Sequence, residues 1–262
     1  MIKVHSLHIY PIKGMMGSSV TSAKVLERGF EHDRRYMLID KNGTFISQRK
    51  HPQLVFFQPQ IVNDSLIIKN KNRSINIPLY STLENTIETT IFEHVVPATE
   101  VSHDANSWFS SILEEDVRLV KMTKKDIRHK DLIKGPKRVE VSFADGYPYQ
   151  IAGTASINKL NTLLERPIGL DRFRPNIVVE TTVPHIEDSW EDIKIGKAEL
   201  LVIKSCARCP VSTVDQILGI KSKEPLKTLA TYRKKENKVY FGANAISRRD
   251  SHIDIGDTVV VL

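Results

Sequence analysis

The sequence contains few cysteines and no long apolar segment. Its 262 residues include only two cysteines, Cys206 and Cys209, and a disulfide between positions so close would form a very small ring that makes a poor structural staple. The pair therefore suggests a reducing compartment and a chemical use for the thiols. The chain does not begin with a basic leader and an apolar run, and no later run is long enough to cross a bilayer. We expect a cytoplasmic protein with no membrane partner.

Aromatic residues are also scarce, at 7% of the chain. The net charge of +7 comes from scattered lysines and arginines, including short groups at 121–125 and 233–235. A nucleic-acid-binding module of this charge would interleave basic and aromatic residues. We therefore expect no nucleic-acid partner. An anionic small ligand could be bound by the same surplus of positive charge. The apolar fraction of 40% and the charged fraction of 26% are typical of soluble globular proteins.

The pattern along the chain predicts a mainly β protein with some α-helix. Strands are expected at 4–9, 36–39, 45–47, 54–62, 66–68, 176–180, 198–204 and 258–262, with turns at Lys41-Asn-Gly43 and Asn63-Asp-Ser65. One helix is expected at 105–114, capped by Asp104, and a second follows Thr154 and ends at Arg166-Pro167. The boundary between two domains, 1–90 and 91–262, is placed in the Thr- and Glu-rich stretch between Pro78 and Thr99.

The segment from Ser205 to Asp215 allows three chemical interpretations. A thioredoxin-like pair would open a helix, but here Cys209 meets Pro210 and β-branched residues. A structural zinc site needs two further ligands, and the nearest histidines are isolated. The third interpretation is one thiolate that ligates a cofactor metal, favoured by Lys204 and Arg208 nearby. A cysteine at a strand end is more often a small buried apolar residue, so spacing alone does not decide.

The sequence as a whole resembles the MOSC proteins that carry an N-terminal MOSC β-barrel domain, such as the amidoxime-reducing components. The resemblance depends on an ordered series of blocks: Tyr10-Pro-Ile-Lys-Gly14, Gly29-Phe-Glu-His-Asp-Arg34, Ser47-Gln-Arg49 with Pro52, Phe143-Ala-Asp145, Phe173-Arg-Pro-Asn-Ile177, Glu187-Asp-Ser-Trp190, Cys206-Ala-Arg-Cys209, Thr213-Val-Asp215 and Lys223-Glu-Pro-Leu226. It implies a small N-terminal β-barrel domain against a larger MOSC β-barrel domain with a few helices, and a molybdenum cofactor (molybdopterin) bound between them.

The resemblance also implies roles for individual residues. Cys209 corresponds to the family's molybdenum ligand, and Cys206 is expected to be structural. Basic side chains would bind the cofactor's phosphate, while Asn176 and Asp145 could hydrogen-bond the pterin and Arg49 would line the substrate side. The expected cofactor-binding residues are Lys13, Gly14, Arg34, Asp145, Arg174, Asn176, Arg208 and Cys209. Two positions differ from relatives: Gly14 replaces a serine of the animal enzymes, and Ala207 a serine of some members.

The activity that this family implies is the reduction of N-hydroxylated compounds, such as amidoximes, hydroxylamines and N-hydroxylated base analogues, from N–OH to N–H. Two cysteines are too few for an iron–sulfur cluster, so the electrons would come from a separate flavin or iron–sulfur protein. The first alternative is a cofactor carrier or sulfur-transfer module that never turns over. The second is a basic RNA-binding β-barrel, which would bind RNA in a salt-sensitive way and hold no molybdenum.

Overall fold

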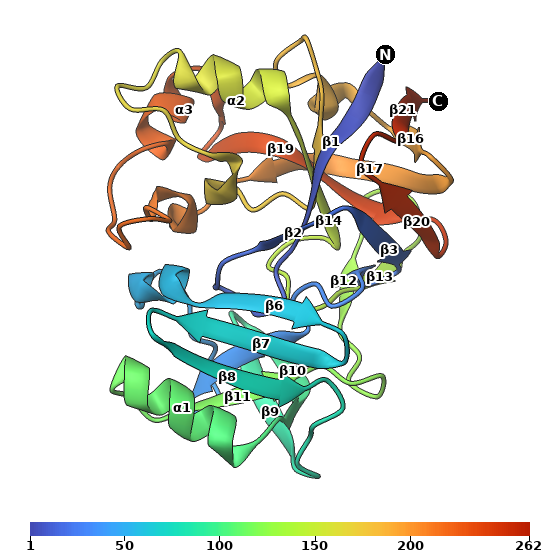
Figure 1. The fold of residues 1–262 in the computed structure, drawn as a ribbon. Helices are drawn as coiled ribbons and strands as arrows, with labels where there is room; N and C mark the ends of the chain where they lie inside the picture. The colour runs from blue at the N-terminus through green and yellow to red at the C-terminus, as the bar shows by residue number, and fades with distance from the viewer.

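The larger half of the molecule is built around a closed barrel of seven strands. The computed structural model describes residues 1–262, and Figure 1 shows the barrel strands above a separate group of sheets. In ring order the strands are β14 (Tyr149–Gly153), β15 (Ile177–Val179), β1 (Ile2–Ile9), β21 (Thr258–Val261), β16 (Asp192–Ile195), β17 (Ala198–Ala207) and β19 (Lys238–Ser247), which pairs back with β14. Only β14 and β15 run parallel, and helix α2 (Thr154–Asn161) follows β14 on the way to β15.

Alternating apolar residues fill the barrel. Leu200 and Val202 of β17 and Ala243 and Ala245 of β19 belong to one buried cluster of 20 residues, as expected when every second side chain of a strand points inward. Two short strands pair with barrel strands, β2 (Ser18–Val20) with β1 and β18 (Lys234–Lys235) with β19. Two small separate sheets are formed by β12 (His129–Asp131) with β13 (Arg138–Glu140), and by β20 (Ser251–Asp254), β3 (Ser22–Leu26) and β4 (Gly29–Phe30).

Helices α2 and α3 (Leu226–Arg233) cover one side of the barrel (Figure 1). Leu160 of α2 and Leu229 of α3 belong to a buried cluster with Phe173 and Phe241, whose rings stack at 3.9 Å between centroids. Short 3-10 helices lie at Leu170–Arg172, Ile186–Ser189 and Pro210–Thr213. The stack fixes the chain just before Arg174, which lines the site described below.

The smaller half consists of two antiparallel sheets and one helix. One sheet has the order β5 (Tyr36–Asp40), β11 (Val117–Lys121), β10 (His94–Glu100) and β9 (Thr86–Ile91), and the other comprises β6 (Gln58–Val62), β7 (Ser65–Asn70) and β8 (Arg73–Pro78). Helix α1 (His103–Leu113) packs Phe109 and Leu113 into a separate core of 16 buried residues. The mainly β architecture with some α-helix is therefore confirmed, whereas the boundary near residue 90 stays a prediction.

Local structure differs from the sequence-based predictions in four places. The strand expected at 54–62 begins only at Gln58, because Pro52 starts a 3-10 helix (Pro52–Phe56) that buries Leu54. In place of the strand expected at 45–47, only Phe45 pairs, in an isolated bridge with Ile39. Ser102, not Asp104, caps α1, since its hydroxyl accepts a hydrogen bond from the Ala105 amide at 3.1 Å. Helix α2 ends at Asn161, before Arg166-Pro167. No helix has the length and apolar character needed to span a membrane.

Candidate functional site

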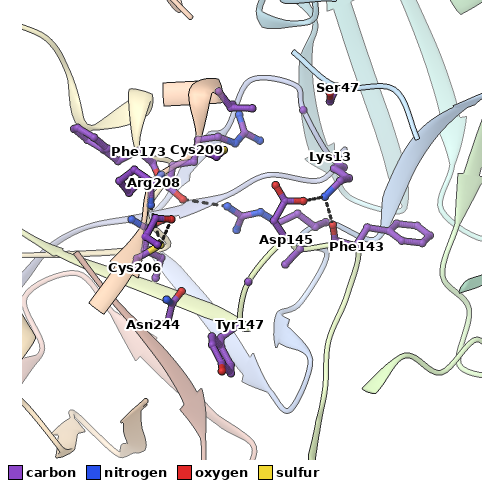
Figure 2. A pocket seen from close by; sticks show the side chains of 18 of the residues that line it. Lys13, Ser47, Phe143, Asp145, Tyr147, Phe173, Cys206, Arg208, Cys209 and Asn244 are labelled. Carbon is purple, nitrogen blue, oxygen red and sulfur yellow. Dashed lines mark hydrogen bonds and ion pairs between the residues drawn. The ribbon is translucent and has the colours of Figure 1, made fainter. Parts of the chain in front are cut away.

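The two halves enclose a cavity of about 380 Å³. Phe45, Ser47 and Phe92 from the smaller half line it opposite Cys206 and Cys209 from the larger half. Figure 2 shows Lys13 and Asp145 facing the loop of Arg208 and Cys209 across this space. All nine residues that the sequence predicts for the site lie in the cavity wall: Lys13, Gly14, Arg34, Arg49, Asp145, Arg174, Asn176, Arg208 and Cys209.

Cys209 lies in a short loop at the end of barrel strand β17. The Arg208 amide donates to the Val239 carbonyl at 2.8 Å, which ties the loop to the next strand. Cys209 is the N-cap of the following 3-10 helix, whose first residue is Pro210, and its carbonyl accepts hydrogen bonds from the amide and hydroxyl of Ser212 at 3.1 and 2.9 Å. The backbone on both sides is thus fixed, and the thiol reaches the cavity from a rigid base.

Cys206 also lines the cavity, although a structural role was expected for it. Its sulfur lies 3.0 Å from Arg208 Nη1, and the same guanidinium donates through Nη2 to the Phe173 carbonyl at 2.6 Å (Figure 2). Arg208 therefore bridges the cysteine loop to the turn that carries Arg174.

Two arginines lie on the ring of Tyr10. The guanidinium carbons of Arg34 and Arg174 are each 4.2 Å from the ring centroid, within the range of cation–π contacts. Burial, followed by repulsion from Arg34, lowers the pKa of Arg174 to about 10. Burial raises the pKa of Tyr10 to about 12, so the phenol stays neutral and donates to the Pro175 carbonyl at 3.1 Å. Tyr10 belongs to the first family block, but its supporting role was not predicted.

Arg34 connects its own segment to the segment of Arg174 and Asn176. It donates to Asp33 Oδ2 at 2.6 Å, to Asn176 Oδ1 at 3.0 Å and to the Arg174 carbonyl at 3.0 Å. Asp33 is fully buried, and Asn176 in turn donates to the His8 carbonyl at 3.2 Å. These contacts set the orientation of Arg34 before any ligand arrives.

Lys13 and Asp145 form an ion pair at the base of the cavity. The Lys13 ammonium also donates to the Phe143 carbonyl at 2.7 Å (Figure 2). Burial lowers the pKa of Lys13; burial also opposes ionisation of Asp145, but the Lys13 ammonium outweighs it and holds the pKa of that carboxyl below its ordinary value. Asp145 is the only acidic residue in a wall that holds eight lysines and arginines.

The smaller half contributes an aromatic section of the wall. Phe92 occupies the β9–β10 turn with a φ of 56°, a conformation that is an outlier for a bulky residue. Its ring lies edge-on to Phe45 at 5.0 Å, and the Arg49 guanidinium lies 4.9 Å from its centroid. The Phe45 amide donates to the Thr90 carbonyl at 3.1 Å, so the turn and Phe45 are held together. Sequence reasoning missed Phe92 because no motif surrounds it.

Several buried donors in the wall have no partner within the protein. They are Arg49 Nε, Gln150 Nε2, Arg172 Nη1, Arg174 Nη2 and Arg208 Nε. Unpaired buried donors are costly and usually indicate a missing partner. Together with the excess of positive charge, they fit an anionic group rich in acceptors, such as a phosphorylated pterin, and a thiol at the same wall fits a soft or high-valent metal. The residues present therefore suit the cofactor that the family resemblance implies.

Comparison with known proteins identifies the family of this chain. Residues 1–116 match the family model described as the MOSC N-terminal beta barrel domain, and residues 138–260 match the MOSC domain. Mitochondrial amidoxime reducing component 2 of Bos taurus is 32% identical over 98% of this chain and 82% of its own length. Mitochondrial amidoxime-reducing component 1 of Homo sapiens is 29% identical over 99% and 82%. The molybdenum cofactor sulfurase of Oryza sativa subsp. japonica is 30% identical over 92% of this chain but only 32% of its own length.

These matches cover nearly the whole chain and both halves of the fold. The chain therefore belongs to the MOSC family, in the group whose MOSC domain follows an N-terminal MOSC β-barrel domain.

Proposed function

We propose that the cavity binds the molybdenum cofactor and that the protein reduces N-hydroxylated compounds. The observation that carries this proposal is the rigidly held Cys209 thiol in a wall with eight basic residues and five unpaired buried donors. Arg34, Arg174 and Lys13 would hold the phosphate, Asn176 and Asp145 would contact the pterin, and Cys209 would ligate the molybdenum. The names of the amidoxime-reducing relatives support the same activity.

The net reaction takes an N–OH group, two electrons and two protons to N–H and water. The bound cofactor would supply the two-electron redox chemistry. The chain's own residues bind and orient the substrate: Phe45 and Phe92 offer an aromatic face, and Arg49 beside them offers a donor. Lys130 also lines the cavity, and burial, helped by the nearby Arg128 and Lys204, lowers its pKa, which makes this ammonium a suitable proton donor.

We also propose that electrons come from a separate flavin or iron–sulfur protein and that the protein works in the cytoplasm. The chain has only two cysteines, both in the cavity wall. They are too few to hold an iron–sulfur cluster of the chain's own.

Turnover tests the proposed function directly. Cofactor-loaded protein should reduce hydroxylamine and acetamidoxime with chemically reduced viologen as the electron donor, followed by loss of viologen absorbance and by product analysis. Protein that is fully loaded with molybdenum and pterin but converts neither compound would instead be a cofactor carrier, the second candidate function, which the rice cofactor sulfurase relative favours.

Phe92 is expected to select substrates with an aromatic ring. In Phe92→Leu, kcat/KM for benzamidoxime should fall about 2- to 10-fold, because an aromatic contact contributes about 0.5–1.5 kcal/mol beyond its buried area. For hydroxylamine, which has no ring, kcat/KM of Phe92→Leu should stay within about twofold of the wild-type value. Tyr80→Leu is the matched control, since Tyr80 is 80% exposed and lies outside the cavity wall. Equal losses for both substrates in Phe92→Leu would contradict a role in ring recognition.

A further inference from the structure

The loop that follows the cysteine segment exposes three aliphatic side chains. In the apolar loop (residues 215–223), Ile217, Leu218 and Ile220 are 83%, 60% and 57% exposed. Single exposed apolar residues are common on soluble proteins, but a group of large ones commonly marks an interaction site. A second such group lies at the end of β21, where Val260, Val261 and Leu262 are exposed, but the group at 217–220 is the one whose loop contacts residues of the cavity wall.

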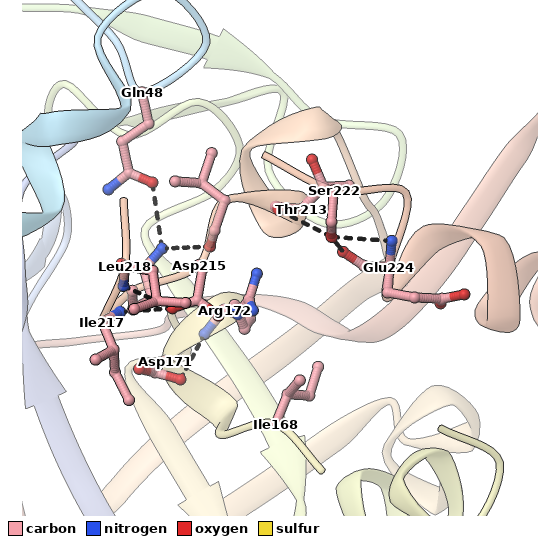
Figure 3. A network of polar contacts seen from close by, with 12 residues as sticks. Gln48, Ile168, Asp171, Arg172, Thr213, Asp215, Ile217, Leu218, Ser222 and Glu224 are labelled. Atoms are coloured by element: carbon pink, nitrogen blue, oxygen red, sulfur yellow. Dashed lines mark hydrogen bonds and ion pairs between the residues drawn. The ribbon is translucent and has the colours of Figure 1, made fainter. Parts of the chain in front are cut away.

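The apolar loop has an ordered conformation. Asp215 Oδ1 accepts hydrogen bonds from the amides of Ile217 and Leu218 at 2.9 and 2.8 Å, and the Asp215 amide donates to the Ile220 carbonyl at 2.8 Å (Figure 3). Gly219 adopts a φ of 65°, and a Cβ there would lie 2.8 Å from the Phe56 ring. The backbone is thus held by a turn that presents the three aliphatic side chains to solvent.

The same loop contacts residues of the cavity wall from both halves of the molecule. Asp215 Oδ2 accepts from Arg172 Nη2 at 2.7 Å, and Gln216 Nε2 lies 3.4 Å from Gln48 Oε1 (Figure 3). The Lys221 ammonium donates to the Arg49 carbonyl. Arg172, Gln48 and Arg49 all line the cavity. A protein seated on the apolar loop would therefore lie beside the proposed cofactor.

Charge indicates which kind of partner fits. Lys221 and Lys223 are exposed within the loop, Lys227 follows on α3, and the whole chain carries a net charge of +7. A second copy of this chain would bring like charges together, whereas an acidic protein would be attracted and steered to the surface. Transient redox complexes use small interfaces of this kind.

We propose that the apolar loop is the docking surface for a small acidic [2Fe–2S] ferredoxin that delivers electrons to the site. This inference rests on the proposed function. Each docked ferredoxin would give up one electron and leave oxidised, so two dockings and two protons would convert one N–OH group into N–H and water. The aliphatic side chains would supply the contact and the lysines the attraction.

The test compares a protein donor with a chemical one. The variant Ile217→Ser/Leu218→Ser/Ile220→Ser should raise KM for reduced plant-type [2Fe–2S] ferredoxin by at least about tenfold, since losing a central interface contact commonly costs more than about 1 kcal/mol. Its rate with reduced viologen should stay within about twofold of the wild-type rate, because exposed substitutions rarely alter the fold. Titration calorimetry with oxidised ferredoxin should show a matching loss of affinity, independent of turnover.

The control variant is Ile255→Ser/Val260→Ser, two residues that are 46% and 47% exposed near the start of β1, at the opposite end from the cavity. It should behave as wild type. In Lys223→Glu, ferredoxin affinity should fall and depend less on salt.

Unchanged ferredoxin KM and affinity in the triple variant would overturn the proposal. So would an equal loss with both donors, or a wild-type dimer that the triple variant converts to monomer. Failure of the wild type with viologen would instead contradict the proposed function, and calorimetry would still decide whether ferredoxin binds the loop.

Discussion

Replacing Cys209 by alanine is expected to abolish reduction of N-hydroxylated substrates. If Cys209 ligates molybdenum, its loss removes a direct metal contact, and the rate should fall by more than the roughly 10–100-fold typical of losing an outer-shell partner of a metal site. The variant should fold normally, because the loop is held by the Arg208 amide, Pro210 and Ser212 rather than by the thiol. Turnover with reduced viologen and the molybdenum spectrum of the loaded protein provide the measurements.

Cys206→Ala is the matched control for this experiment. Cys206 lines the same cavity and contacts Arg208 Nη1, so its removal should change the rate modestly and leave the metal spectrum intact. Equal retention of active molybdenum centres in both variants would contradict the assignment of Cys209 as the ligand. A loss in Cys206→Ala alone would transfer that role to Cys206.

The second large expected effect is a loss of stability in the variant Arg34→Leu. Arg34→Leu leaves the carboxylate of Asp33 without its ionic partner, and that side chain is fully buried. Breaking a buried ion pair from one side typically costs about 3–5 kcal/mol in the free energy of unfolding. The same change removes the hydrogen bonds to Asn176 and to the Arg174 carbonyl, so cofactor affinity should fall as well. Urea unfolding and pterin analysis measure the two effects.

The double variant Asp33→Asn/Arg34→Leu separates charge from packing. Asparagine keeps an oxygen that can accept the Tyr10 amide hydrogen bond, which Asp33 Oδ1 accepts at 2.8 Å, but it carries no charge. Much of the lost stability should therefore return. If the double variant is as unstable as Arg34→Leu, the unpaired charge of Asp33 is not the cause.

The sequence was sufficient to predict the mainly β architecture and part of the cavity wall. Apolar segments bounded by turns predicted four of the seven barrel strands, β1, β15, β17 and β21, but not β14, β16 and β19; the family resemblance supplied the barrel, and its blocks named nine residues that the fold brings into one wall. Their chemical roles stay predictions. Predictions were correct where neighbouring residues alone form the structure. An example is the turn at Gly43, where Asp40 Oδ1 accepts hydrogen bonds from the Asn42 and Thr44 amides.

Features that depend on distant partners were not predictable. Tyr10 bonds to the Pro175 carbonyl, 165 positions away, and its ring supports arginines from two other segments. Phe92 lies in the stretch between Pro78 and Thr99, which has little periodicity, and its turn is joined to Phe45 by the hydrogen bond from the Phe45 amide to the Thr90 carbonyl. The strand expected from Leu54 fails for a similar reason, since tertiary burial of a 3-10 turn outweighs β propensity there.

The closure of the barrel by β1 has a consequence for how the protein is made. Ile2 pairs with Val259, and Val4 pairs with Val179, so β1 is synthesised before the other barrel strands and must wait for β21 before the ring is complete. Such distant pairings slow folding and leave strand edges open meanwhile. The smaller half, whose sheets lie between Tyr36 and Lys121, can form during this wait, and nascent chains should therefore gain protease resistance there first.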